Sequence, residues 1–164
     1  MMHRVAEIAD LPFSVRLFLA AYRWRKIDPL PWSVPRLPLR DSRIALVSTA
    51  GLVAPGQTPF DEHVKGGDWS YREIPDDADV ASLVEYHRSQ SFDHSGVAAD
   101  ANVAFPLDRL HELAAAGVIG SCNRRHFSFM GSITAPGRLI QRSAPEVADA
   151  LVQDAVDAVV LVPI

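Results

Sequence analysis

Hydroxyl side chains follow an apolar run near the start of the chain, where a strand would give way to a loop. Residues 43–50 (RIALVSTA) have the composition of a buried strand that ends at Ser48 and Thr49, before Gly51. In open α/β sheets, ligands bind at the carboxyl ends of the parallel strands. Ser48 and Thr49 are therefore candidate substrate-binding residues.

Two familiar kinds of chemistry are not indicated for this loop. The sequence contains neither G-x-G-x-x-G nor G-x-x-x-x-G-K-[ST], so a phosphate cradle would depend on a single glycine. A hydrolase using Ser48 with a histidine is disfavoured, because no G-x-S-x-G elbow is present.

A second strand-like run ends in another candidate loop. Residues 124–131 (RRHFSFMG) alternate in the manner of a strand and lead into Met130 and Gly131. His126 lies early in this apolar run, and a structural, hydrogen-bonded histidine is as good an interpretation as a functional one. Met130 and Gly131 are candidate substrate-binding residues, and His126 is a candidate supporting residue.

Polar residues also surround the predicted strand at residues 66–75 (GGDWSYREIP). Asp68 and Arg72 are candidates here for contact with a substrate.

Acidic residues at 76, 77 and 79 suit the N-terminus of a helix, and the apolar stripe that follows places His87 among packed side chains. Residues 91–102 read as a loop. Its Asp93, His94, Asp100 and Asn102 lack the spacing of a metal site, so no metal is expected.

The remaining elements predict the fold class. Residues 105–117 form a helix that Gly117 ends, and Ser143 with Glu146 forms a capping box before the last helix. The run AVDAVVLVPI, from 155 to 164, has the density of a central strand buried on both faces. Alternation of strands and helices predicts an α/β three-layer sandwich with a mainly parallel, Rossmann- or flavodoxin-like sheet.

The N-terminal segment differs from the rest of the chain. Residues 11–26 read as a basic amphipathic helix that covers its own domain or a partner subunit, or that contacts a membrane surface. Four prolines in residues 28–38 then predict an extended linker. We expect residues 1–40 to form this leader and residues 41–164 to form one α/β domain.

Composition restricts the class of protein. Residues 1–40 carry seven Lys or Arg and three Asp or Glu, and the remainder carries nine and seventeen. An acidic body argues against a nucleic-acid partner, because phosphate binding needs a basic surface. A single cysteine and the absence of a signal-like or membrane-spanning run predict a soluble, cytoplasmic protein.

Five separated motifs resemble the selenoprotein B family of glycine, sarcosine, betaine and D-proline reductases, and in particular the selenocysteine subunit of D-proline reductase. They lie in the family's order and at similar spacing: IALVSTAG at 44–51, GDWSYREIP at 67–75, DANVAFPLDRLHELAAAGVIG at 100–120, HFSFMG at 126–131 and VDAVVLVPI at 156–164. The resemblance implies reductive cleavage of a carbon–nitrogen bond in an amino-acid-type substrate.

The resemblance also implies what lies beyond the last residue. In the family, the redox selenocysteine, or a cysteine replacing it, directly follows the strand that matches residues 159–164. We therefore expect a chain that ends at Ile164 just before this residue and is inactive alone, with a UGA codon read as a stop as one explanation. Cys122 does not match the redox position.

The family further implies a partner reductase subunit, an oligomer and, in the D-proline enzyme, a pyruvoyl group on the partner. The loops after Ala50 and Gly131 would flank the site. Arg72 would contact a substrate carboxylate and His126 would transfer a proton. The alternative is a non-catalytic α/β protein that binds a partner or ligand and docks through its basic N-terminal helix.

Overall fold

A computed structural model describes residues 9, 11–22, 26–89 and 94–164. The chain divides into two compact units, residues 1–34 and residues 35–164. Trp24 and its neighbouring arginines, and Asp93 of the predicted loop, lie outside the described residues.

The first unit contains helix α1, Phe13–Ala21. None of its residues is buried, and the ring of Phe18 lies 5.7 Å from that of Tyr22, the residue that follows the helix. In the part of the chain that the structure describes, no helix is long and apolar enough to cross a bilayer.

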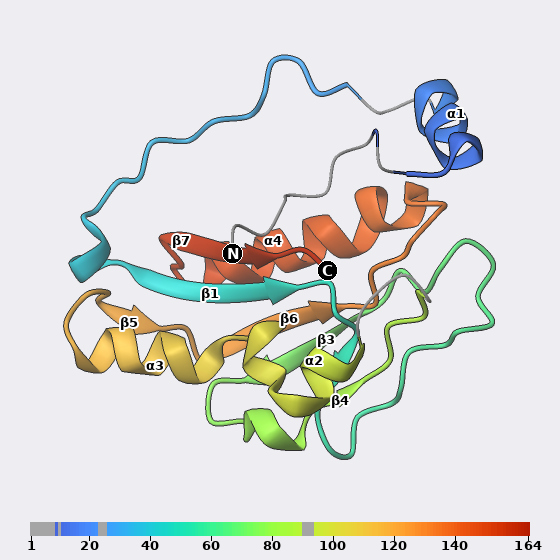
Figure 1. Ribbon diagram of the computed structural model, residues 1–164. Helices are drawn as coiled ribbons and strands as arrows, with labels where there is room; N and C mark the ends of the chain where they lie inside the picture. The colour runs from blue at the N-terminus through green and yellow to red at the C-terminus, as the bar shows by residue number, and fades with distance from the viewer. Residues whose placement is uncertain (1–8, 10, 23–25, 90–93) are drawn as a thin grey trace, which may run out of the picture. The chain divides into compact units, whose positions relative to one another are not determined.

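The second unit is built around a curled sheet (Figure 1). Strand β1, Arg43–Ser48, pairs in parallel with three strands: β5 (Ser121–Cys122), β6 (Arg125–Phe129) and β7 (Ala158–Val162). Strand β3, Tyr71–Pro75, pairs antiparallel with β6. The prediction of an α/β fold is confirmed, and the sheet is mixed.

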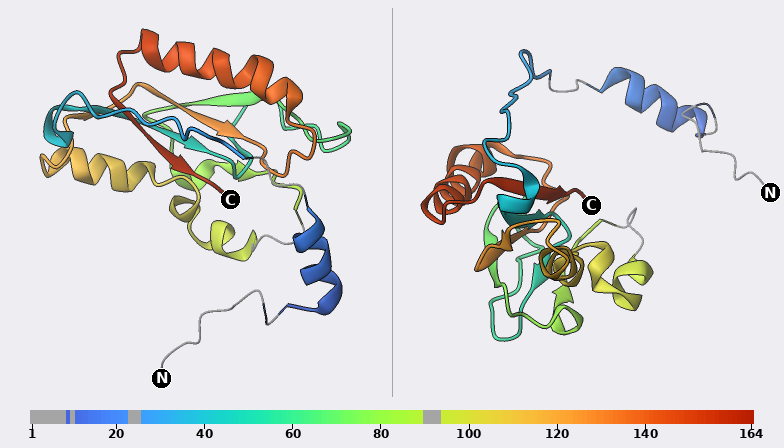
Figure 2. Two further views of the ribbon diagram at one scale, coloured as in Figure 1. Left: turned by 90° about the horizontal axis from the view of Figure 1, so that it is seen from above. Right: turned by 90° about the vertical axis from the view of Figure 1, so that its left-hand side faces the viewer.

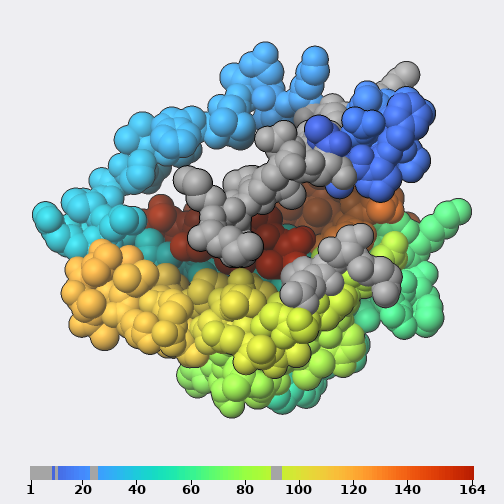
Figure 3. Space-filling view, in the orientation of Figure 1, coloured from blue at the N-terminus to red at the C-terminus, as the bar shows by residue number. Residues whose placement is uncertain are grey.

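The last strand corrects the prediction of a central position. β7 pairs with β1 along residues 44–48 and with no other described strand, so it forms an edge of the sheet. Leu161 is 70 % exposed, and atoms of β7 reach the surface in Figure 3. The apolar composition of this strand therefore does not reflect burial on both faces.

Helices cover both faces of the sheet, as Figure 2 shows from above. Helix α4, Ala144–Gln153, packs through Val147 against the aromatic rings of β6. On the opposite face, α2 (His94–Ala99) and α3 (Leu107–Ala115) pack against the larger core cluster that contains Ile44 and Leu46. Gly117 follows α3 with a positive φ of 68°, which confirms the predicted stop.

Short elements replace two predicted ones. The helix expected up to His87 is a 3₁₀ turn, Val80–Ser82, followed by strand β4, Val84–Glu85, which pairs with β2, Leu52–Val53. Asp79 caps only this turn, because Leu83 already has an extended backbone. The predicted loop at 91–102 contains α2 and a second 3₁₀ turn, Ala101–Val103.

The predicted capping box is also wrong. A π-helical turn, Leu139–Ser143, runs directly into α4, so Ser143 already has helical backbone angles. Its hydroxyl donates to the Trp69 carbonyl at 2.6 Å instead of capping the helix. A last 3₁₀ turn, Leu39–Asp41, precedes β1.

Candidate functional site

The carboxyl ends of β1 and β7 lie side by side and are hydrogen-bonded to each other. The Thr49 amide donates to the Val162 carbonyl at 3.1 Å, and the Thr49 hydroxyl accepts from the Ile164 amide at 2.8 Å. Although β7 is an edge strand, its end therefore lies beside the first predicted loop. Ligands in α/β sheets bind at such carboxyl ends.

The loop after β6 reaches the same place. Gly131 has a φ of 64°, and a Cβ atom there would press on the Thr49 carbonyl oxygen and lie 2.7 Å from His87 Nε2. Only glycine allows this backbone conformation and this close approach without strain. The structure thus brings Thr49 and Gly131 together and adds His87 to them.

His87 has the environment of a neutral imidazole. Its Nδ1 accepts a hydrogen bond from the Ser89 amide at 3.3 Å, which places the ring proton on Nε2, on the side of Gly131. Burial lowers the pKa of His87, and the nearby His94 lowers it further, against the opposing charge of Glu85. A neutral histidine with its N–H near a strand end can donate a hydrogen bond to a reacting group.

An acidic and a basic side chain flank His87. His94 Nδ1 lies 2.6 Å from a Glu85 carboxylate oxygen, and its Nε2 lies 3.0 Å from the Ser89 carbonyl oxygen. Both of these oxygens can only accept, so the geometry suits an imidazolium paired with a carboxylate. The three side chains line a cavity of about 540 Å³ together with Phe60, Asp61, Glu62, His63, Tyr86 and Arg88.

Two of the predicted substrate-binding residues are enclosed in the core. Ser48 is fully buried, and its hydroxyl donates to the Ala104 carbonyl at 2.8 Å and accepts from the Ala50 amide at 3.1 Å. Met130 is fully buried and packs with Val53 and Phe60. Both side chains are therefore part of the core that supports the loops at Thr49 and Gly131.

The side chains of Asp68 and Arg72 hydrogen-bond to the backbone of residues 58–61 and 70–71, around the start of β3. Asp68 accepts from the amides of Asp61 and Ser70 and from the Ser70 hydroxyl. Burial raises the pKa of this carboxyl, but the hydrogen bonds outweigh burial and the pKa is lowered. Arg72 donates to the carbonyls of Thr58, Pro59 and Tyr71 and stacks on Phe60 at 4.2 Å.

His126 lies apart from Gly131. It is fully buried at the start of β6, where Nδ1 accepts from the Leu46 amide at 2.9 Å and Nε2 lies 3.1 Å from Asp76 Oδ1. Burial lowers the pKa of His126, and Asp76 opposes this. Four residues of strand, about 13 Å, separate it from Met130.

Neither the position of Cys122 nor the pKa of its thiol is that of a redox nucleophile. It pairs with Ile44 near the amino end of β1, whereas Thr49 follows the carboxyl end. Burial and the charge of Asp76 raise the pKa of the thiol to about 11. Because the thiolate is the reactive form, this thiol is a poor nucleophile near neutral pH.

Sequence reasoning missed Glu85, His87 and His94 as a group. The sequence predicted a helix over residues 80–87 with His87 on its packed face, and it predicted a loop around His94. A glutamate at the end of a short strand and a histidine two residues after it give no distinctive local signal, so only the folded chain brings the three together.

Comparison with known proteins shows to which family the chain belongs. The family model for glycine/sarcosine/betaine reductase selenoprotein B matches residues 6–163. The chain belongs to this family. No solved structure matches it.

Two curated relatives are reductase subunits. D-proline reductase subunit gamma of Acetoanaerobium sticklandii is 33 % identical over 136 residues, which cover 82 % of this chain and 54 % of the relative. Glycine reductase complex component B subunit gamma of Symbiobacterium thermophilum is 26 % identical over 158 residues, covering 96 % of this chain and 37 % of the relative. The chain thus spans about half, or less, of the length of these relatives.

Proposed function

We propose that this chain is part of a reductase-complex subunit that cleaves the carbon–nitrogen bond of an amino-acid-type substrate with a selenol or thiol. Family membership supports a reductase-complex role. The observation that carries the proposal is the end of β7, where Ile164 is hydrogen-bonded to Thr49 beside the Gly131 loop. A residue following Ile164 would enter the same neighbourhood.

We place the redox selenocysteine or cysteine directly after Ile164, outside residues 1–164. Such a group must be ionised near neutral pH to act as a nucleophile. Cys122 does not suit this requirement, because its pKa is raised to about 11. The 164-residue chain alone is then inactive, and a partner subunit supplies the electrophilic pyruvoyl carbonyl in a D-proline-type enzyme.

His87 is the side chain of this site that best suits a hydrogen bond to the reacting group. Its Nε2 faces the Gly131 loop, and its pKa is lowered by burial. The roles of Arg72 with a substrate carboxylate and of His126 in proton transfer remain predictions. Arg72 hydrogen-bonds to backbone carbonyls and to Ser70 and stacks on Phe60. His126 hydrogen-bonds to the Leu46 amide and to Asp76.

The Rossmann- or flavodoxin-like assignment belongs to this proposal too. Helices on both faces of the sheet and three parallel pairings around β1 support it, whereas the antiparallel β3 departs from it.

The test compares two chains that differ by one atom at the proposed position. One carries a single cysteine after Ile164 and the other a single serine. Each is combined with the pyruvoyl subunit of a D-proline reductase, a dithiol and D-proline, or tested with glycine-type substrates. We expect dithiol-dependent ring opening or amine release with the cysteine chain only. Equal, background-level turnover by both chains would remove the enzymatic interpretation.

A non-catalytic role is the second candidate, and helix α1 favours it. Phe13, Leu17 and Phe18 are all exposed on this helix, which has no buried residue in its own unit. An exposed apolar helix of this kind suits docking to a partner subunit or to a membrane surface. Removing residues 1–34 should then abolish co-elution with the partner subunit, or co-sedimentation with anionic vesicles, without unfolding the second unit.

A further inference from the structure

Three side chains with metal-binding atoms meet at the amino end of the sheet, away from the proposed reductase site. Asp76 follows β3, His111 lies on α3 and Cys122 lies in β5. One ligand atom from each lies within 4.8 Å of those of the other two, and all three residues are half-buried. His111 Nε2 lies 2.9 Å from Asp76 Oδ1.

His111 and Cys122 are part of regular structure, and Asp76 lies in the turn directly after β3. The Asp76 amide donates to the Arg124 carbonyl at 3.0 Å, and Cys122 is in parallel register with Ile44 of β1. His111 lies in the middle of a helix whose Leu107 and Leu110 are buried in the core. Ligands mounted on strands and helices bind an ion with little reorganisation.

A fourth residue positions the carboxylate. His126 Nδ1 accepts the Leu46 amide proton, so the other ring nitrogen carries the N–H that lies 3.1 Å from Asp76 Oδ1. This donor fixes the Asp76 side chain and leaves its second oxygen available. Metal-ligating carboxylates are commonly held by such an outer hydrogen bond.

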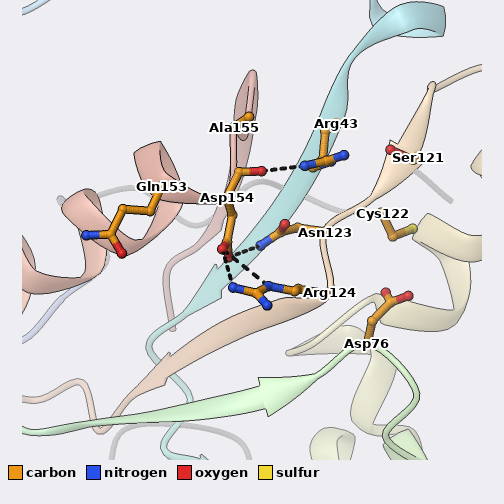
Figure 4. Close-up of a pocket in the computed structure, with 9 residues that line it drawn as sticks. All are labelled: Arg43, Asp76, Ser121, Cys122, Asn123, Arg124, Gln153, Asp154 and Ala155. Carbon is orange, nitrogen blue, oxygen red and sulfur yellow. Dashed lines mark hydrogen bonds and ion pairs between the residues drawn. The ribbon is translucent and has the colours of Figure 1, made fainter.

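The cluster opens onto a cavity. Asp76 and Cys122 are part of the wall of a pocket of about 530 Å³, and Figure 4 shows them on the same side of it, away from Asp154. Three protein ligands beside open volume leave room for water or a small ligand in a fourth position.

We propose that Asp76, His111 and Cys122 bind a divalent transition-metal ion of the Zn²⁺ class. Thiolate, imidazole and carboxylate are the ligands that Zn²⁺ takes in proteins, and the bound ion itself displaces the proton of a coordinating thiol. The sulfur disfavours Mg²⁺ and Ca²⁺, which prefer oxygen. The site is distinct from the proposed reductase site, since Cys122 pairs near the start of β1 and Thr49 follows its end.

The test uses the untagged full chain and Co²⁺ as a spectroscopic substitute for Zn²⁺. We expect one equivalent of Co²⁺ to produce a thiolate-to-metal charge-transfer band and tetrahedral d–d bands, and Zn²⁺ to displace it stoichiometrically. Zn²⁺ should also raise the melting temperature by several degrees, whereas Mg²⁺ and Ca²⁺ should leave it unchanged.

Matched variants locate the ion. Cys122→Ser should abolish the charge-transfer band, and His111→Gln and Asp76→Asn should each weaken Co²⁺ binding by tenfold or more. Asp77→Asn removes an adjacent, exposed carboxylate and should bind as the parent does. The proposal is overturned by a parent chain that shows no thiolate band with excess Co²⁺, by a band that survives Cys122→Ser, or by equal losses in Asp76→Asn and Asp77→Asn. Because the metal-binding test measures no reductase activity, its outcome is independent of the proposed function.

Discussion

Asp154, the residue that follows α4, is the carboxylate on which polar side chains of residues 123–125 converge. It is buried and accepts from Arg125 Nε at 2.7 Å, from Asn123 Nδ2 at 3.0 Å and from Arg124 Nη2 at 2.9 Å. The hydrogen bond from Arg125 is the main cause that holds its pKa well below the usual range, with burial opposing it and Asn123 and Arg124 adding to it. The charged carboxylate therefore stabilises the native state.

This arrangement predicts both a stability loss and a change of pH dependence in Asp154→Asn. The native pKa is lowered, so the stabilisation is present above the unfolded-state pKa of about 4 and is lost as the pH falls below it. We expect the variant to lose about 3 kcal/mol in the free energy of unfolding at pH 7 and to show a flatter acid limb. Urea denaturation between pH 3 and pH 7 measures both. An acid limb identical to that of the parent would contradict the assignment.

Gly131 allows a second prediction at the scale of one residue. An alanine there combines a left-handed φ of 64° with a close contact on Thr49 and His87. We expect Gly131→Ala to lower the free energy of unfolding by about 2–3 kcal/mol.

Two glycines serve as controls for Gly131→Ala. Gly56 has a φ of 83° but no atom within 4 Å of an added Cβ, so Gly56→Ala isolates the backbone strain, about 1 kcal/mol. Gly137 has open space and no positive φ, and Gly137→Ala should be neutral. If Gly131→Ala costs no more than Gly56→Ala, the close approach of the two loops is wrong.

At the scale of the element, the sequence indicated those parts whose local pattern decides their structure. β1, β6 and α3 follow from alternation, from helical spacing and from the stop at Gly117, and the two loops that meet at Thr49 and Gly131 were expected to flank one site. Acidic residues before Val80 do not distinguish a 3₁₀ turn from an α-helix, because both expose the same amides. Because the element was predicted to be a helix, His87 was assigned to its packed face and not to the site.

The position of β7 could not be read from its composition. A run of Val and Leu shows that a strand favours burial, but it does not say which strand lies beside it. Here β7 pairs with β1 on one side only and leaves its other edge and Leu161 exposed. The end of the strand still reaches Thr49, because the parallel pairing with β1 carries it there.

For the whole molecule, the open edge of β7 predicts association. An apolar edge strand offers unpaired backbone groups to another strand. We expect Leu161→Lys to reduce concentration-dependent self-association in sedimentation velocity while it changes the melting temperature little. Val152→Lys is the matched control, since Val152 is 77 % exposed on α4 and lies off the sheet edge. Equal effects of the two substitutions, or a parent that is monomeric at every concentration, would contradict a role for this edge.

The proposed reductase activity depends on a redox selenocysteine or cysteine directly after Ile164, beside Thr49 and the Gly131 loop. Intact-mass spectrometry of the protein isolated from its own source tests it most directly. We expect a polypeptide heavier than 18.0 kDa, with selenium's isotope pattern or with a cysteine directly after Ile164 in place of selenocysteine. A native product of 18.0 kDa without selenium would contradict it.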